Sequence, residues 1–184
     1  ADPSRFYDIA VYNAELSKLL GVGYPGQNWP NPPTALLPMA PFGILGFFPA
    51  LFAWFVIGIG ALTLTVRRTF ADVRVLAVLM VSPAALLCLI SGQSSFLTTA
   101  ALIGAFFCWD RRPVLAGVLI GLLTVKPQLG ILIPFALIAS RRWTVFVSAA
   151  VTALALVALS TALFGPEIWI AYITKALPLQ REVL

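Results

Sequence analysis

The residues best suited to chemistry in this 184-residue sequence are Lys126, Pro127 and Gln128, which interrupt a long apolar stretch. A lysine beside a proline at the end of a short helix can hold an anionic group as a point charge. The segment that begins near Gln128 would direct unsatisfied backbone N–H groups toward the same place. The alternative is a lysine that extends to the membrane surface beside a helix-breaking proline. Because a cation within a membrane is costly, the pattern favours an anion-binding site.

A second polar stretch, Gly92-Gln93-Ser94-Ser95, offers groups that suit a ligand rich in hydroxyls. The amide of Gln93 and the hydroxyl of Ser94 both donate and accept hydrogen bonds. The alternative role of this stretch is to cap the helix that follows, through Ser94 or Ser95. The two roles are compatible with each other.

A third candidate is the proline-rich stretch Trp29-Pro30-Asn31-Pro32-Pro33, which cannot form a regular helix. Here Trp29 and Asn31 would form a rigid lip with an aromatic surface for a sugar ring or a lipid. The alternative is an aromatic anchor at the membrane interface ahead of the first span.

The titratable residues limit the chemistry further. The sequence has no histidine, which removes zinc hydrolysis, Ser-His-Asp catalysis and haem ligation by histidine. Cys88 and Cys108 lie in apolar runs, which argues against a disulfide or a thiolate metal site. Asp8, which precedes a predicted surface helix, is the candidate general base, and its alternative is a solvated carboxylate at a helix start. We expect no cofactor, and weak binding of a divalent metal stays open.

The composition places these residues in a membrane protein. Hydrophobic residues make up 60% of the chain, charged residues make up 10%, and the mean hydropathy is +0.97. Soluble chains are roughly 45–50% apolar and about 25% charged. The net charge of +5 comes largely from arginine pairs between apolar segments, which is typical of topology signals and does not indicate nucleic-acid binding.

We therefore predict an all-α fold, a polytopic transmembrane helical bundle with several short or broken segments. Residues 1–41 would form an outer-face loop with an amphipathic interfacial helix within Phe6–Leu20, and residues 42–184 the bundle. The six predicted apolar segments are Phe42–Val66, Asp72–Ile90 with a kink at Pro83, Phe96–Trp109, Val114–Val125, Leu129–Ala139 and Thr144–Phe164.

Arginines in alternate connections predict the sidedness of this bundle. Arg67, Arg68 and Arg74, then Arg111 and Arg112, then Arg141 and Arg142 occupy every second connection, which the positive-inside rule assigns to the cytosol. All the polar candidate loops then fall on the opposite face. Residues 114–139 could also form one kinked span, which would bury Lys126 in mid-membrane, so we favour two short helices that enter a cavity and turn back.

Several of these stretches together resemble a known family. They are Trp29–Pro33, Gly92-Gln93-Ser94-Ser95-Phe96-Leu97, Arg111-Arg112-Pro113, Ala116-Gly117, Gly121-Leu122 and Lys126-Pro127-Gln128. The combination resembles glycosyltransferase family 87, polytopic membrane enzymes of superfamily C that use polyprenyl-phosphate sugars. The sequence departs from the family pattern at Trp29–Pro33, where a tyrosine-led element is usual, and at Ser94, where asparagine is common.

The resemblance implies inverting transfer of a hexose, often mannose, from a polyprenyl-phosphate carrier to a lipid or glycan acceptor at the outer face of the bacterial cytoplasmic membrane. Lys126 would hold the phosphate, and Gln93, Ser94 and Gln128 would contact sugar hydroxyls. The family's catalytic base is an aspartate in the first outer loop, which we expect upstream of Ala1 in a longer protein. The alternative hypothesis is a secondary transporter or flippase for an anionic or lipid-linked substrate, because broken apolar segments are also typical of transporters.

Overall fold

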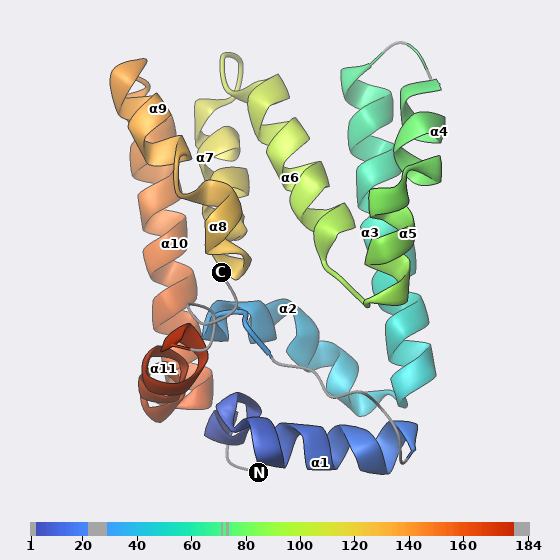
Figure 1. The fold of residues 1–184 in the computed structure, drawn as a ribbon. Coiled ribbons are helices and arrows are strands. Elements are labelled where there is room, and N and C mark those ends of the chain that lie inside the picture. Colours follow the sequence, from blue (N-terminus) through green and yellow to red (C-terminus); the bar gives the residue numbers. More distant parts are fainter. Residues whose placement is uncertain (1–2, 22–28, 71, 73, 179–184) are drawn as a thin grey trace. The chain divides into compact units, whose positions relative to one another are not determined.

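The computed structural model describes residues 3–21, 29–70, 72 and 74–178 (Figure 1). Every regular element in this part of the chain is a helix, so the predicted all-α class is confirmed. The chain forms two compact units, one of residues 38–154 and one of residues 1–37 with 155–184.

The unit of residues 38–154 consists of helices, several of which begin at a proline. A proline at the first helical position costs nothing, because its missing N–H would be unpaired there in any case. The elements are a 3₁₀ turn at Ala40–Ile44, α3 (Phe47–Thr69), α4 (Arg74–Val81), α5 (Pro83–Ile90), α6 (Ser95–Cys108), α7 (Pro113–Gly121), a 3₁₀ turn at Leu122–Val125, α8 (Pro127–Gly130), α9 (Ile133–Ala139) and the first half of α10 (Trp143–Phe164).

Among the described residues, two helices are long and apolar enough to cross a membrane, α3 with 23 residues and α10 with 22. The other predicted segments form shorter or broken helices, so six full spans are not confirmed. The predicted segment Asp72–Ile90 breaks at Ser82, whose hydroxyl accepts a hydrogen bond from the Ala85 N–H at 3.2 Å and caps α5.

The exposed side chains of α3 indicate an apolar solvent. Phe48 and Phe52 are 75% and 71% exposed, whereas Leu62 and Val66 on the same helix are buried against α5 and α6. Large apolar side chains presented outward in such number are unfavourable in water and favourable in lipid. Figure 1 shows α6 between α3 and α7, and its contacts with both helices form the centre of this unit.

α7 packs against α10 through two glycines four residues apart. A Cβ atom added to Gly117 would lie 2.5 Å from the Cβ of Ser148, and one added to Gly121 would lie 2.5 Å from the Cβ of Thr152. The Ser148 hydroxyl donates a hydrogen bond to the Val114 carbonyl at 2.8 Å. Small residues at this spacing let helix backbones approach closely in membranes, where packing replaces the hydrophobic effect between helices.

Residues 113–139, from α7 to α9, form a re-entrant segment: the chain runs into this unit and then turns back toward the end from which it came. Arg142, after α9, donates a hydrogen bond to the Asp110 carboxylate, before α7, at 2.7 Å, and its guanidinium lies 4.2 Å from the ring centre of Trp109. The connections before α7 and after α9 therefore lie at the same end. A single kinked span over residues 114–139 would place them at opposite ends, so that alternative is wrong.

The unit of residues 1–37 and 155–184 is built around a small aromatic core. The side chains of Tyr7, Ile168, Ala171 and Tyr172 are buried in it. Its elements are a 3₁₀ turn at Pro3–Tyr7, α1 (Ile9–Leu20), a 3₁₀ turn at Pro33–Ala35, the second half of α10, α11 (Glu167–Ala171) and a π-helical turn at Tyr172–Ala176, while α2 (Leu36–Met39) adjoins the other unit in sequence. α1 thus forms within the predicted range Phe6–Leu20. Its position at a membrane interface stays a prediction.

The glycine contact yields a stability prediction. We expect Gly117→Ala to lower the free energy of unfolding by roughly 1–3 kcal/mol, because the new methyl group overpacks the interface with α10. It would lie 2.6 Å from the Val145 carbonyl oxygen, a backbone atom that cannot rotate away. Gly60→Ala is the matched control, since that exposed glycine of α3 has no neighbour within 4 Å of an added Cβ. Thermal unfolding in detergent measures both, and equal midpoints for the two variants would contradict the packing.

Candidate functional site

Lys126 lies where the helical path of the re-entrant segment breaks. Its backbone is extended, with φ −139° and ψ 78°, because the following Pro127 disfavours helical geometry at the preceding residue. Its side chain is only 9% exposed. The ammonium donates hydrogen bonds to Oε1 of Gln93 at 2.6 Å and to Oγ of Ser95 at 3.3 Å.

The turn between α5 and α6 presents Gln93 to this ammonium. Gly92 has a φ of +64°, which glycine adopts without steric cost, and it lets the chain reverse direction after α5. The Gln93 N–H donates to the Cys88 carbonyl at 3.0 Å, and the Cys88 thiol donates to the Gln93 carbonyl at 3.2 Å. The backbone of Gln93 is therefore held from both sides, which leaves its side chain to contact Lys126.

In the part of the chain that the structure describes, no carboxylate pairs with Lys126. Within the described residues, the ion pairs are Lys18–Glu15, Arg142–Asp110 and Lys175–Asp8. The two oxygens that Lys126 contacts are neutral, and a lysine ammonium has three N–H bonds to satisfy. A buried charge with neutral partners alone is energetically unfavourable, so this arrangement suits an anionic ligand.

The structure places the other predicted residues of this unit differently. Ser95, the first residue of α6, contacts the ammonium, whereas Ser94 makes no capping hydrogen bond with its side chain. Gln128 is exposed at the start of α8. The sequence offered both serine hydroxyls to a ligand and favoured Ser94, because which of two adjacent serines faces Lys126 depends on the rotation of α6.

The three predicted residues of the other unit have structural partners of their own. Asp8 caps α1 by accepting from the Val11 N–H at 3.3 Å and pairs with Lys175 at 3.3 Å. The Val11 amide, followed by the Lys175 ammonium, holds the pKa of the Asp8 carboxyl below its ordinary value, which keeps it ionised and makes it a weaker base.

Trp29 and Asn31 are both half-buried beside the aromatic core of this unit. Trp29 packs against that core, and the carbonyl of Asn31 accepts a hydrogen bond from the Tyr7 hydroxyl at 2.8 Å. Burial raises the pKa of the Tyr7 hydroxyl, so it stays protonated and able to donate. These contacts fix the start of the proline-rich stretch against the aromatic core.

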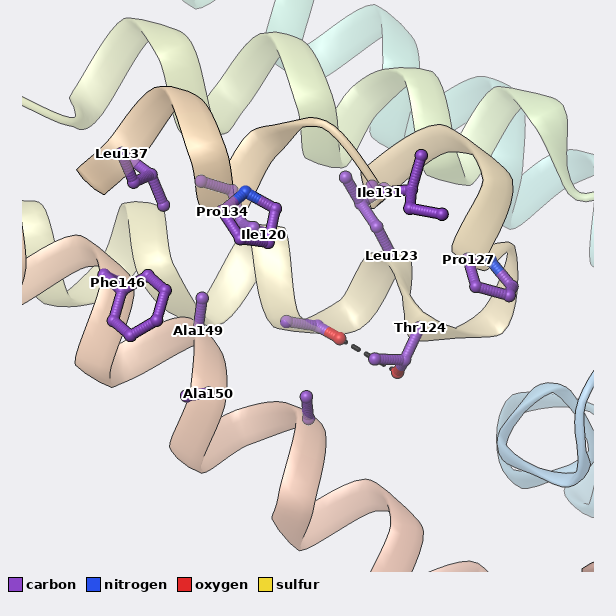
Figure 2. Close-up of a pocket in the computed structure, with 13 residues that line it drawn as sticks. Ile120, Leu123, Thr124, Pro127, Ile131, Pro134, Leu137, Phe146, Ala149 and Ala150 are labelled. Atoms are coloured by element: carbon purple, nitrogen blue, oxygen red, sulfur yellow. Dashed lines mark hydrogen bonds between the residues drawn. The ribbon is translucent and has the colours of Figure 1, made fainter. Parts of the chain in front are cut away.

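An apolar pocket of about 380 Å³ lies between the re-entrant segment and α10 (Figure 2). Its lining residues are Ile120, Gly121, Leu123, Thr124, Pro127, Gly130, Ile131, Pro134, Leu137, Phe146, Ala149, Ala150 and Ala153. The Thr124 hydroxyl donates to the Gly121 carbonyl at 2.9 Å, as the dashed line in Figure 2 shows. Pro127 joins this pocket to the Lys126 site in sequence, so an apolar cavity adjoins the residue that breaks the helix.

The described residues contain no group of histidine, cysteine, aspartate or glutamate side chains arranged to hold a metal ion. The chemistry of the site therefore comes from an ammonium, an amide and a hydroxyl. Such a set binds and polarises a ligand, and it does not itself supply a strong base.

A buried cation among short, broken apolar helices is the kind of site that a membrane protein could use to bind an anionic ligand. The profile of glycosyltransferase family 87 matches residues 29–183, so the chain belongs to this family. Membership indicates a membrane glycosyltransferase. A search of curated proteins and a search of solved structures gave no match.

The two ends of α6 allow a test of sidedness. We expect Ser91→Cys to react with a membrane-impermeant maleimide added outside intact cells, and Ser140→Cys to react only after permeabilisation. Both serines are exposed, and they lie at the Lys126 end and the arginine end of this unit. The unmodified protein, in which Cys88 is buried and Cys108 half-buried, supplies the background. Labelling of Ser140→Cys from outside intact cells would show that the membrane topology is opposite to the predicted one.

Proposed function

We propose that this protein transfers a hexose, with mannose as the first candidate, from a polyprenyl-phosphate carrier to a lipid or glycan acceptor. The reaction takes place at the outer face of the bacterial cytoplasmic membrane. The observation that carries the proposal is the buried Lys126 ammonium, whose partners among the described residues are the neutral oxygens of Gln93 and Ser95. The missing negative charge is supplied by the phosphate of the lipid-linked sugar.

The proposed step is a displacement at the anomeric carbon of the donor. A carboxylate base takes the proton of the acceptor hydroxyl, and the acceptor oxygen forms a bond to that carbon. The bond from the carbon to the phosphate oxygen breaks at the same centre, and its electron pair leaves with the polyprenyl phosphate. Lys126 stabilises the negative charge that grows on the leaving phosphate, which lowers the barrier.

Family likeness assigns the base to an aspartate of the first outer loop. In this chain Asp8 is the candidate, although its carboxylate is engaged by the Val11 amide and by Lys175. These contacts lower its pKa and weaken it as a base. Asp8 is therefore a weak candidate for the base.

Recognition of the sugar is assigned to the polar groups around the ammonium. With Oε1 of Gln93 occupied by Lys126, the amide NH₂ of Gln93 is the group that donates to a sugar hydroxyl. Ser94 and Gln128 complete the proposed set in this unit, and the roles of Trp29 and Asn31 toward a sugar or lipid stay predictions from the sequence. The apolar pocket beside Pro127 supplies a surface for the hydrocarbon chain of the carrier.

Lys126→Ala tests the role of the ammonium. We expect a loss of sugar transfer of about 10²- to 10³-fold, because removing one charge-stabilising donor typically costs that much in rate. The assay follows a radiolabelled sugar from polyprenyl phosphate into product in native membranes, with protein level measured by immunoblot. Lys18→Ala is the matched control, since Lys18 is exposed and paired with Glu15. Unchanged transfer by Lys126→Ala would remove the phosphate-binding role.

A second experiment separates transfer from transport, because the broken helices around Lys126 also suit a transporter or flippase. The purified protein in liposomes receives a radiolabelled polyprenyl-phosphate sugar and a crude lipid acceptor fraction. We expect a labelled product with a new glycosidic bond, resolved by chromatography and released by a glycosidase. Movement of the intact donor across the bilayer without such a product would favour the transporter instead.

A further inference from the structure

A second cavity lies at the opposite end of α6 from Lys126. Its volume is about 460 Å³, and it is formed by the last turns of α3 and α6 and the first turns of α7. Arg68, Arg111 and Arg112 line it together with Thr69, Phe107 and Leu115. The volume lies within the range of ligand-binding pockets, roughly 300–1,000 Å³.

The three arginines of this cavity lack carboxylate partners among the described residues. Residues 38–154 contain two carboxylates, Asp72 and Asp110. Asp110 pairs with Arg142, and Asp72 accepts a hydrogen bond from the backbone N–H of Arg74 at 2.8 Å. The cavity thus has three cationic groups without acidic compensation, and its complementary ligand is an anion.

A polar group within the cavity wall also lacks a partner. The Thr69 hydroxyl is buried and has no hydrogen-bond partner in the described part of the chain, although buried hydroxyls are ordinarily paired. The rest of the wall is mostly apolar, and Phe107 and Leu115 in it are 48% and 42% exposed. The wall of the cavity therefore combines cationic and polar groups with exposed apolar side chains.

We infer that this cavity binds an anionic phospholipid of the surrounding bilayer. The phosphate lies among Arg68, Arg111 and Arg112, an oxygen of the headgroup accepts a hydrogen bond from Thr69, and an acyl chain follows Phe107 and Leu115. A free phosphate would leave the apolar wall unused, whereas a phospholipid carries both chemistries in one molecule. Basic pockets between membrane helices are typical binding sites for such headgroups. The inference does not depend on the proposed sugar transfer, because it concerns the other end of α6.

Lipid titration followed by native mass spectrometry tests this site. The detergent-purified protein is titrated with phosphatidylglycerol or with phosphatidylcholine of the same acyl chains. We expect preferential binding of phosphatidylglycerol and a loss of affinity of about fivefold for each arginine removed, so about 25-fold for Arg68→Gln with Arg112→Gln. Arg67→Gln is the matched control, because Arg67 is the exposed neighbour of Arg68 and does not line the cavity.

A cavity-filling variant keeps the test decisive if the double variant fails to fold. Leu115→Trp retains all three arginines and fills the apolar side, so we expect it to lower phosphatidylglycerol binding as well. Equal affinity for the two lipids, or an equal loss in Arg67→Gln, would show that the arginines act only as general surface charge. Competition by millimolar inorganic phosphate would overturn the assignment to a lipid.

Discussion

The hydrogen bond between the Lys126 ammonium and the Gln93 side chain is the interaction on which the arrangement of this unit depends. It joins two interruptions of the apolar sequence, the turn between α5 and α6 and the break before α8, over a distance of 2.6 Å. An ammonium held by neutral oxygens in an apolar surrounding is incomplete without an anion. The same bond therefore sets the local geometry, and it supports the proposal that the ligand is an anion.

Short helices make such a site possible within a membrane. α6 has 14 residues, about 21 Å of helix, whereas the hydrocarbon core is about 30 Å thick. α6 is therefore too short to reach both membrane interfaces. Polar groups at one of its ends must line a recess. α7 stays in place beside α10 through Gly117 and Gly121, where the backbones approach too closely for any larger residue. The glycines thus fix the helix that leads to Lys126.

The sequence predicted the features that local rules control. The predicted apolar segments Phe96–Trp109 and Thr144–Phe164 agree with α6 and α10 to within one residue. The arginine pairs correctly grouped Asp110 and Arg142 at one end, as their contact shows. The choice of Ser95 over Ser94 was not predictable, because it follows from the rotation of α6 against the re-entrant segment. The break at Ser82 was predicted only as a kink, since whether a proline bends or divides a helix depends on what caps the new start.

The cationic side chains at the two ends of α6 differ in exposure to solvent. This difference explains why arginines lie at one end and a lysine at the other. At the arginine end the guanidinium groups are exposed, and each remains hydrated while it borders a cavity, so several can gather without acidic partners. At the other end a single lysine is buried, and a second cation beside it would add repulsion without hydration. A compact ammonium fits the space between an amide and a hydroxyl, whereas a planar guanidinium would require a wider opening. One lysine is therefore the arrangement that leaves room for a ligand to complete the charge balance.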